Sequence, residues 1–95
     1  MTNEEEPKNR YTVKLASKRI EKAFDSLPKN DYRKIAEEIK RLAINPRPHG
    51  VKKLSDQVHR IRIGNYRVVY SIFDKEKIIL IAKVARRSES TYTDF

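Results

Sequence analysis

The residues best suited to chemistry in this chain are three arginines in a short alternating segment. Residues 59–70 alternate basic or polar side chains with apolar ones on both sides of a Gly-Asn dipeptide. Two such runs joined by two turn residues predict a β-hairpin, and the turn length fixes its register. Arg62 should then lie directly opposite Arg67, with Arg60 on the same face of the sheet. Because like charges in opposed positions destabilise a sheet, this pattern indicates that the arginines bind an anion.

The same register defines an apolar side of the hairpin. It pairs Ile63 with Tyr66 and Ile61 with Val68 on this side, and Arg60 with Val69 on the other. Tyr66 and Tyr70 therefore belong to the core. His59 also turns to the apolar side, which favours a structural role over that of a base. His49 lies in a loop between Pro48 and Gly50, so the pattern does not fix its position.

Composition limits the possible partners and sites. Ninety-five residues suggest one domain, and 22 Lys and Arg against 13 Asp and Glu give a net charge of +9. This excess favours a polyanion such as nucleic acid, although membrane phosphates or an acidic protein would also satisfy it. The absence of cysteine excludes disulfides, thiolate zinc sites and a cysteine nucleophile. No apolar run reaches the length of a membrane span, so we expect a soluble cytoplasmic protein.

Two helices are predicted between a first strand and the hairpin. Residues 1–9 contain Glu4, Glu5 and Glu6 and are expected to form a flexible acidic tail. Residues 11–15 alternate between inward-facing and outward-facing side chains with a period of two, which predicts a strand. Ser17 should cap a helix that ends at Pro28, and Asn30 or Asp31 should cap a second one that ends before Pro46. Their apolar positions are Ile20, Ala23, Phe24 and Leu27, and then Tyr32, Ile35, Ala36, Ile39, Leu42 and Ala43.

The last strand, residues 78–84, follows a basic loop at 47–53 and the hairpin. A four-residue connection to this strand would bury Lys83, so we expect a three-residue connection. That register places Ile72, Tyr70, Val68 and Tyr66 opposite Ile78, Leu80, Ala82 and Val84, respectively. It also places Lys83 beside Arg67, and alternation brings Arg87 to the same face.

These elements predict an α+β domain over residues 10–95. An N-terminal strand and a helical hairpin precede a three-stranded antiparallel meander, and the helices pack on one face of an antiparallel sheet. The other face carries the arginines.

Arginines on a rigid sheet suit phosphate, because guanidinium offers a planar fork of donors and remains protonated. With RNA, such a group could stabilise the charge that develops when a ribose 2′-oxygen attacks the adjacent phosphorus. The strands lack a carboxylate cluster, which argues against a two-metal nuclease, so we expect neither metal nor cofactor. Tyr92 could stack on a base or could cover the edge of the core. Lys52 and Lys53 could contact the RNA backbone or remain solvated.

The pattern over residues 11–92 resembles the RelE/ParE superfamily of bacterial toxins, particularly its RelE-like branch. The residues that carry the resemblance are Leu27-Pro28, Lys53-Leu54, the hairpin segment 59–70 and the C-terminal Arg87 and Tyr92. The resemblance implies a RelE-like fold and a toxin that cleaves messenger RNA in the ribosomal A site without a metal. It also implies a cognate antitoxin that neutralises the toxin.

The resemblance assigns the catalytic positions to Arg60, Arg62, Arg67, Arg87 and Tyr92, with Arg86 as the other candidate for the late arginine. RNA contacts are expected from Lys52, Lys53, Lys83 and Arg86. Arginine at positions 60 and 62, where the best-known member has lysine, implies electrostatic stabilisation rather than proton transfer. The alternatives are a ParE-like inhibitor of DNA gyrase and a non-catalytic RNA-binding module.

Overall fold

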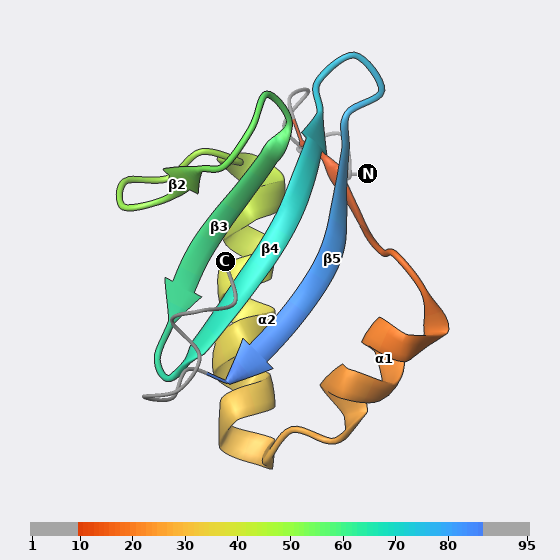
Figure 1. Ribbon diagram of the computed structural model, residues 1–95, viewed down its shortest axis with the longest axis vertical. Helices are drawn as coiled ribbons and strands as arrows, with labels where there is room; N and C mark the ends of the chain where they lie inside the picture. Colours follow the sequence, from red (N-terminus) through yellow and green to blue (C-terminus); the bar gives the residue numbers. More distant parts are fainter. Residues whose placement is uncertain (1–9, 87–95) are drawn as a thin grey trace, which may run out of the picture.

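The computed structural model describes residues 10–86, which form one five-stranded sheet and two helices (Figure 1). The elements in chain order are β1 (Thr12–Leu15), α1 (Lys18–Asp25), α2 (Lys29–Ile44), β2 (Lys52–Lys53), β3 (Val58–Ile63), β4 (Tyr66–Phe73) and β5 (Ile78–Arg86). The strand order in the sheet is β1-β5-β4-β3-β2. The α+β class, the two helices and the β3–β4–β5 meander are therefore confirmed. The segment expected to be an acidic tail, residues 1–9, lies outside the described residues.

The sheet differs from the prediction at both edges. β1 pairs with β5 in parallel, so the sheet is mixed rather than antiparallel. No tight turn connects these two strands, and a long connection leaves either direction open. At the other edge, the lysines expected in a loop form the two-residue strand β2, which pairs antiparallel with β3.

The helices pack on one face of the sheet, as predicted, and Figure 1 shows α2 behind it. The Ser17 side chain caps α1 by accepting a hydrogen bond from the Ile20 amide at 3.4 Å. The predicted cap of α2 is wrong, because the helix begins at Lys29 and Pro28 precedes it without a side-chain cap. Asp31 instead lies in the first turn, where its carboxylate accepts a hydrogen bond from the Tyr66 hydroxyl at 3.0 Å.

The core lies between α2 and the inner face of the sheet. Its largest fully buried side chains are Tyr70, Ile35, Leu42, Ile72, Ile79, Ile81 and Val68. Tyr70 donates a hydrogen bond to the Pro46 carbonyl at 2.7 Å, and burial raises the pKa of this phenol to about 12. His59 is 3% exposed and stacks on the Tyr70 ring, and its Nδ1 lies 3.1 Å from the Gln57 carbonyl oxygen. The structural role predicted for His59 is therefore confirmed.

The predicted register between β4 and β5 is wrong. Phe73 pairs with Ile78, which leaves a four-residue connection, and Tyr70 pairs with Ile81. The pairing then shifts, so that Val69 lies opposite Lys83 and Ala82 has no partner of its own. This β-bulge reverses the alternation after residue 82, so Lys83 stays exposed despite the four-residue connection.

A polar cluster joins the β4–β5 turn to the loop after α2. Asp74 accepts a hydrogen bond from the Tyr11 hydroxyl at 2.6 Å and two from Arg47, at 2.9 and 3.3 Å. These hydrogen bonds, first those from Arg47, lower the pKa of Asp74 to about 2.

Asp74 should make part of the stability depend on acidity. A carboxyl whose folded pKa is depressed stabilises the fold above its unfolded pKa, near 3.8, and loses that contribution as the pH falls toward 2. Wild type should therefore be more stable than Asp74→Asn at pH 5, and the difference should vanish toward pH 2. Urea midpoints measured across this range provide the check. A difference that does not change with pH would contradict the ionic role of Asp74.

Candidate functional site

The hairpin of β3 and β4 has the register that the sequence predicts. Ile63 pairs with Tyr66, Arg62 with Arg67, Ile61 with Val68 and Arg60 with Val69. Gly64 has a φ of 58°, whereas Asn65 has no positive φ, which is the pattern of a type II′ turn. The turn thus places Arg62 and Arg67 directly opposite each other.

These arginines lie on the side of the sheet that faces away from the helices. We call this side the arginine face and define it by Arg60, Arg62 and Arg67 together with Lys52 and Lys83. Lys52 pairs with Arg60, Arg60 with Val69, and Val69 with Lys83, so these residues form one row across four strands. Arg62, Arg67 and Ala85 form the next row. Adjacent strands are about 4.8 Å apart, so the five cations occupy a compact area.

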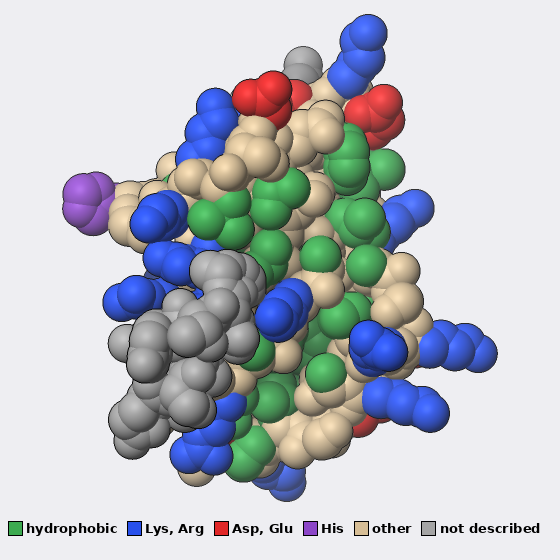
Figure 2. Space-filling model, in the orientation of Figure 1, with side chains coloured by type: hydrophobic (Ala, Val, Ile, Leu, Met, Phe, Trp, Pro, Cys, Tyr) green, Lys and Arg blue, Asp and Glu red, His purple; other side chains and the backbone are tan. Residues whose placement is uncertain are grey.

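The arginine face has a basic part and an apolar part. Figure 2 shows Lys and Arg side chains gathered over β2 and β3, with hydrophobic side chains over β4 and β5. Arg62 is exposed, whereas Arg60 and Arg67 are half-buried. Val69 is only 9% exposed and lies between Arg60 and Lys83. The face therefore offers charge for phosphate beside an apolar surface.

A groove of about 410 Å³ adjoins this face where β2 ends and leaves the edge of β3 uncovered. Arg62 lines it from β3, whereas Lys34 and Glu38 line it from α2, so the α2 wall carries charges of both signs. The remaining lining residues are Pro48, His49, Gly50, Ile61, Ile63 and Gly64. A polyanion bound on the arginine face could extend into this groove.

Arg62 should destabilise the fold while it serves the site. Its side chain makes no hydrogen bond or ion pair within residues 10–86, and it lies opposite Arg67. We expect Arg62→Thr to raise the free energy of unfolding by about 0.2–1 kcal/mol at low salt, because a like-charge pair is removed. The gain should shrink near 1 M salt, where the screening length is only about 3 Å. Urea denaturation at both salt concentrations measures it, and a gain that is independent of salt would contradict the electrostatic cause.

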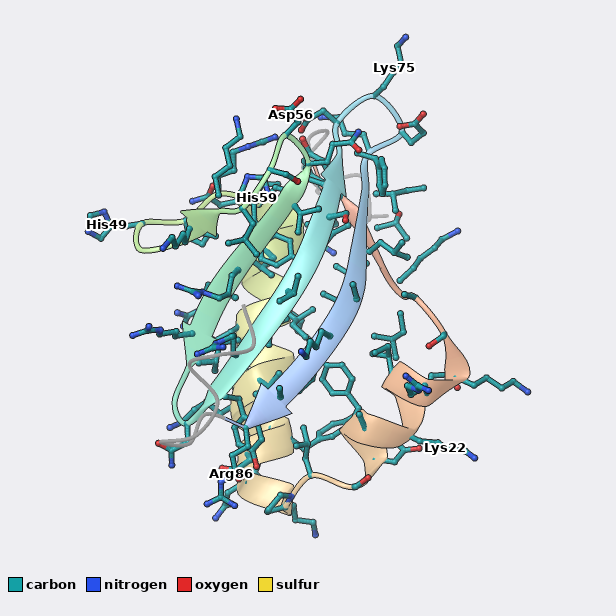
Figure 3. All side chains as sticks on the ribbon, viewed as in Figure 1. Lys22, His49, Asp56, His59, Lys75 and Arg86 are labelled. Atoms are coloured by element: carbon teal, nitrogen blue, oxygen red, sulfur yellow. The ribbon has the colours of Figure 1, made fainter. Side chains whose placement is uncertain are left out.

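The structure brings together only some of the predicted site residues. Arg60, Arg62, Arg67, Lys52 and Lys83 share one face. Lys53 pairs with His59, whose side chain points inward, so Lys53 lies on the other side of the edge strand. His49 projects from its loop away from the sheet (Figure 3). Arg87 and Tyr92 lie outside the described residues.

Arg86 lies away from the arginine face. It pairs with Tyr66, whose side chain is in the core. Burial and the hydrogen bond to Asp31 raise the pKa of the Tyr66 hydroxyl, and the charge of Arg86 partly offsets this effect. Figure 3 shows Arg86 at the end of β5. The Asp31–Tyr66–Arg86 group is not predictable from the sequence, because its members are far apart in the chain and no local pattern links them.

Metal-ligating side chains do not gather in the described part of the chain. Within residues 10–86, no three His, Cys, Asp or Glu side chains come close enough to hold a metal ion. None of the helices in the same range combines the length and apolar composition needed to cross a bilayer.

Comparisons with known proteins identify the family. Residues 10–91 match the family model described as the ParE toxin of the type II toxin–antitoxin system parDE. A protein of Methanocaldococcus jannaschii named "Putative toxin RelE1" is 40% identical over 75 residues, which cover 74% of this chain and 83% of the relative. The chain belongs to the RelE/ParE superfamily of type II toxins.

Solved structures of RelE proteins show the same fold. The RelE of the archaeal RelE–RelB complex from Pyrococcus horikoshii is 38% identical, with a TM-score of 0.77 over 85% of this chain and 99% of that chain. The isolated RelE toxin of E. coli is 17% identical, with a TM-score of 0.74 over 88% of this chain and 93% of that chain, and it shows the fold alone. The protein is thus a RelE-like toxin in sequence and in architecture.

Proposed function

We propose that this RelE-like toxin is a ribosome-dependent endoribonuclease that cleaves messenger RNA in the A site. The observation that carries the proposal is the arginine face, in which Arg62 and Arg67 are directly opposed and Arg60 and Lys83 lie in the adjacent row. Opposed like charges destabilise a sheet, and a bound anion would offset that cost. The phosphate backbone of RNA supplies such anions at regular spacing.

The proposed reaction uses the substrate's own nucleophile. The ribose 2′-oxygen attacks the adjacent phosphorus, the bond to the 5′-oxygen breaks, and a 2′,3′-cyclic phosphate and a 5′-hydroxyl result. Arg67 and Arg87 hold the scissile phosphate by paired hydrogen bonds, while Arg60 and Arg62 stabilise the added negative charge. Because the attacking group is already on the RNA, the reaction requires neither a metal nor a cofactor.

The remaining predicted residues bind or position the RNA. Tyr92 stacks on a base beside the scissile phosphate and orients the 2′-hydroxyl. The RNA backbone on either side of the scissile phosphate is contacted by Lys52, Lys53 and Arg86. Lys52 lies in the same row as Arg60, whereas Lys53 and Arg86 reach the RNA only where it passes around an edge of the sheet.

A cognate antitoxin is the proposed protein partner. The RelE of Pyrococcus horikoshii, which is 38% identical to this chain, forms a complex with RelB. We infer that the antitoxin of this protein presents acidic side chains to the arginine face. Because ribosomes and this antitoxin would be met in the cytoplasm, we propose that the protein acts there.

Gyrase inhibition is the second candidate, because the matching family model carries the ParE name. Primer extension on ribosome-bound messenger separates the two functions when purified protein is added. Cuts within the A-site codon would support the ribonuclease. The absence of cuts, together with gyrase-dependent DNA breaks, would support the ParE-like function.

An RNA-binding module without catalysis would bind ribosomes but leave the messenger intact. Tyr92→Phe tests this third alternative, because a ribonuclease variant should lose cleavage while it still sediments with ribosomes. A wild-type protein that sediments with ribosomes and produces neither RNA cuts nor DNA breaks would favour the binding module.

A further inference from the structure

Strand β5 contains a β-bulge next to the arginine face. Ile79 and Ile81 point into the core, and regular alternation would also turn Lys83 inward. The unpaired Ala82 shifts the register by one residue, so Lys83 lies opposite Val69 on the outer side of the sheet. Bulges are common beside active sites, where they redirect a side chain. Here the redirected side chain is a lysine that joins three arginines.

The proposed cleavage needs a proton donor that the arginines do not supply. When the bond from phosphorus to the 5′-oxygen breaks, that oxygen leaves with a negative charge and must gain a proton. A guanidinium retains its proton in proteins, whereas an ammonium can release one. Among the described residues of the arginine face, only Lys52 and Lys83 carry an ammonium group.

The positions of the two lysines favour Lys83. It lies on the nine-residue strand β5, diagonally across from Arg67. Its partner on β4 is Val69, which is only 9% exposed. Lys52 lies diagonally across from Arg62, but its strand has only two residues and lies at the edge of the sheet. Catalytic groups need a rigid support, and beyond the bulge β5 pairs with β4 from Lys83 to Arg86.

We propose that Lys83 is the general acid of the cleavage reaction, an inference that rests on the proposed ribonuclease function. The 2′-oxygen forms its bond to phosphorus and gives its proton to water. The bond to the 5′-oxygen breaks, and the ammonium of Lys83 transfers a proton to that oxygen. The amine then regains a proton from water.

A messenger with sulfur in place of the scissile 5′-oxygen tests this role. A thiolate leaves without protonation, because thiols are far more acidic than alcohols, with a pKa of about 8.5 in cysteine. We expect Lys83→Met to cleave the ordinary messenger on ribosomes about 10²–10³-fold more slowly than wild type does. On the sulfur-containing messenger, the loss should fall below about tenfold, because the donor is no longer needed.

Three further variants separate proton donation from charge. Lys83→Arg keeps the charge but should show the same selective loss, because arginine does not release its proton. Lys52→Met should slow both messengers by the same factor, as expected for a backbone contact. The double variant Ala82→Lys with Lys83→Ala keeps the net charge and moves the ammonium by one residue, and it should behave like Lys83→Met. Binding to ribosomes and the circular dichroism spectrum confirm that each variant is folded.

Two results would overturn the general-acid role of Lys83 but leave the ribonuclease function standing. The first is a Lys83→Arg variant that cleaves the ordinary messenger within about threefold of wild type, since general acid catalysis contributes far more. The second is a Lys83→Met variant that is equally impaired on both messengers. A wild-type protein that cleaves neither messenger would contradict the ribonuclease itself, and Lys83 would then have no reaction to serve.

Discussion

Replacing Arg67 with alanine is expected to lower the rate of messenger cleavage on the ribosome by about 10²–10³-fold, a loss typical of removing one group that stabilises transition-state charge. Arg67 is half-buried in the middle of the sheet, opposite Arg62 and diagonal to Lys83. The Nε atom of its guanidinium is buried. Single-turnover primer extension with saturating toxin measures the loss.

Two variants show whether the loss is specific to this guanidinium. Arg67→Lys keeps the charge without the planar fork, so its rate should lie between those of wild type and Arg67→Ala. Arg33→Ala removes the same charge from an exposed position on α2, and its rate should equal that of wild type. If Arg33→Ala were as slow as Arg67→Ala, the effect would come from net charge and not from the site.

The largest effect on stability is expected from Ile35→Ala, which should lower the free energy of unfolding by about 2–5 kcal/mol. Ile35 is 0% exposed and is the most deeply buried residue of α2, within the cluster that supports the inner face of the sheet. The cavity left by the truncation would not be filled, because both the helix and the sheet are fixed by their own hydrogen bonds. Urea denaturation followed by circular dichroism provides the measurement.

The same helix offers a matched control. Ile44 is 54% exposed, so Ile44→Ala should change the free energy of unfolding by less than about 0.5 kcal/mol. Equal losses in the two variants would contradict burial as the cause of the effect at Ile35, because Ile→Ala by itself improves helix propensity. The inner face of β4 supports the arginines on its outer face, and an unfolded molecule loses both faces. Ile35→Ala should therefore also reduce cleavage in proportion to the unfolded fraction.

Local sequence patterns were sufficient to predict the structure wherever residues close in sequence are also close in space. The Gly-Asn turn fixed the entire β3–β4 register, because a two-residue connection allows only one pairing of the strands that flank it. The apolar spacing of Ile35, Ile39 and Leu42 fixed the buried side of α2 for the same reason. The cap of α2 was the local exception, because the helix begins at Lys29 and leaves Asp31 in its first turn, where it accepts a hydrogen bond from the distant Tyr66.

The register of β5 shows why a correct conclusion about a residue can follow from a wrong pairing. The sequence predicts a three-residue β4–β5 connection that keeps Lys83 out of the core. The structure keeps the four-residue connection and inserts Ala82 as a bulge, which exposes Lys83 at the same face. The cost of burying an isolated lysine excluded the inward position, but it did not determine which rearrangement would avoid it.

The sequence by itself determined the α+β class, the core side of each helix and the opposed arginine pair, because short-range periodicity and a tight turn set all three. Only the tertiary structure decided that β1 runs parallel to β5, that β2 adds Lys52 to the row of Arg60, and that a bulge, and not a shorter connection, places Lys83 beside Arg67. These features depend on backbone pairing between segments that no short turn connects, so hydrogen bonding and packing of the whole sheet must select among pairings that the sequence pattern leaves open.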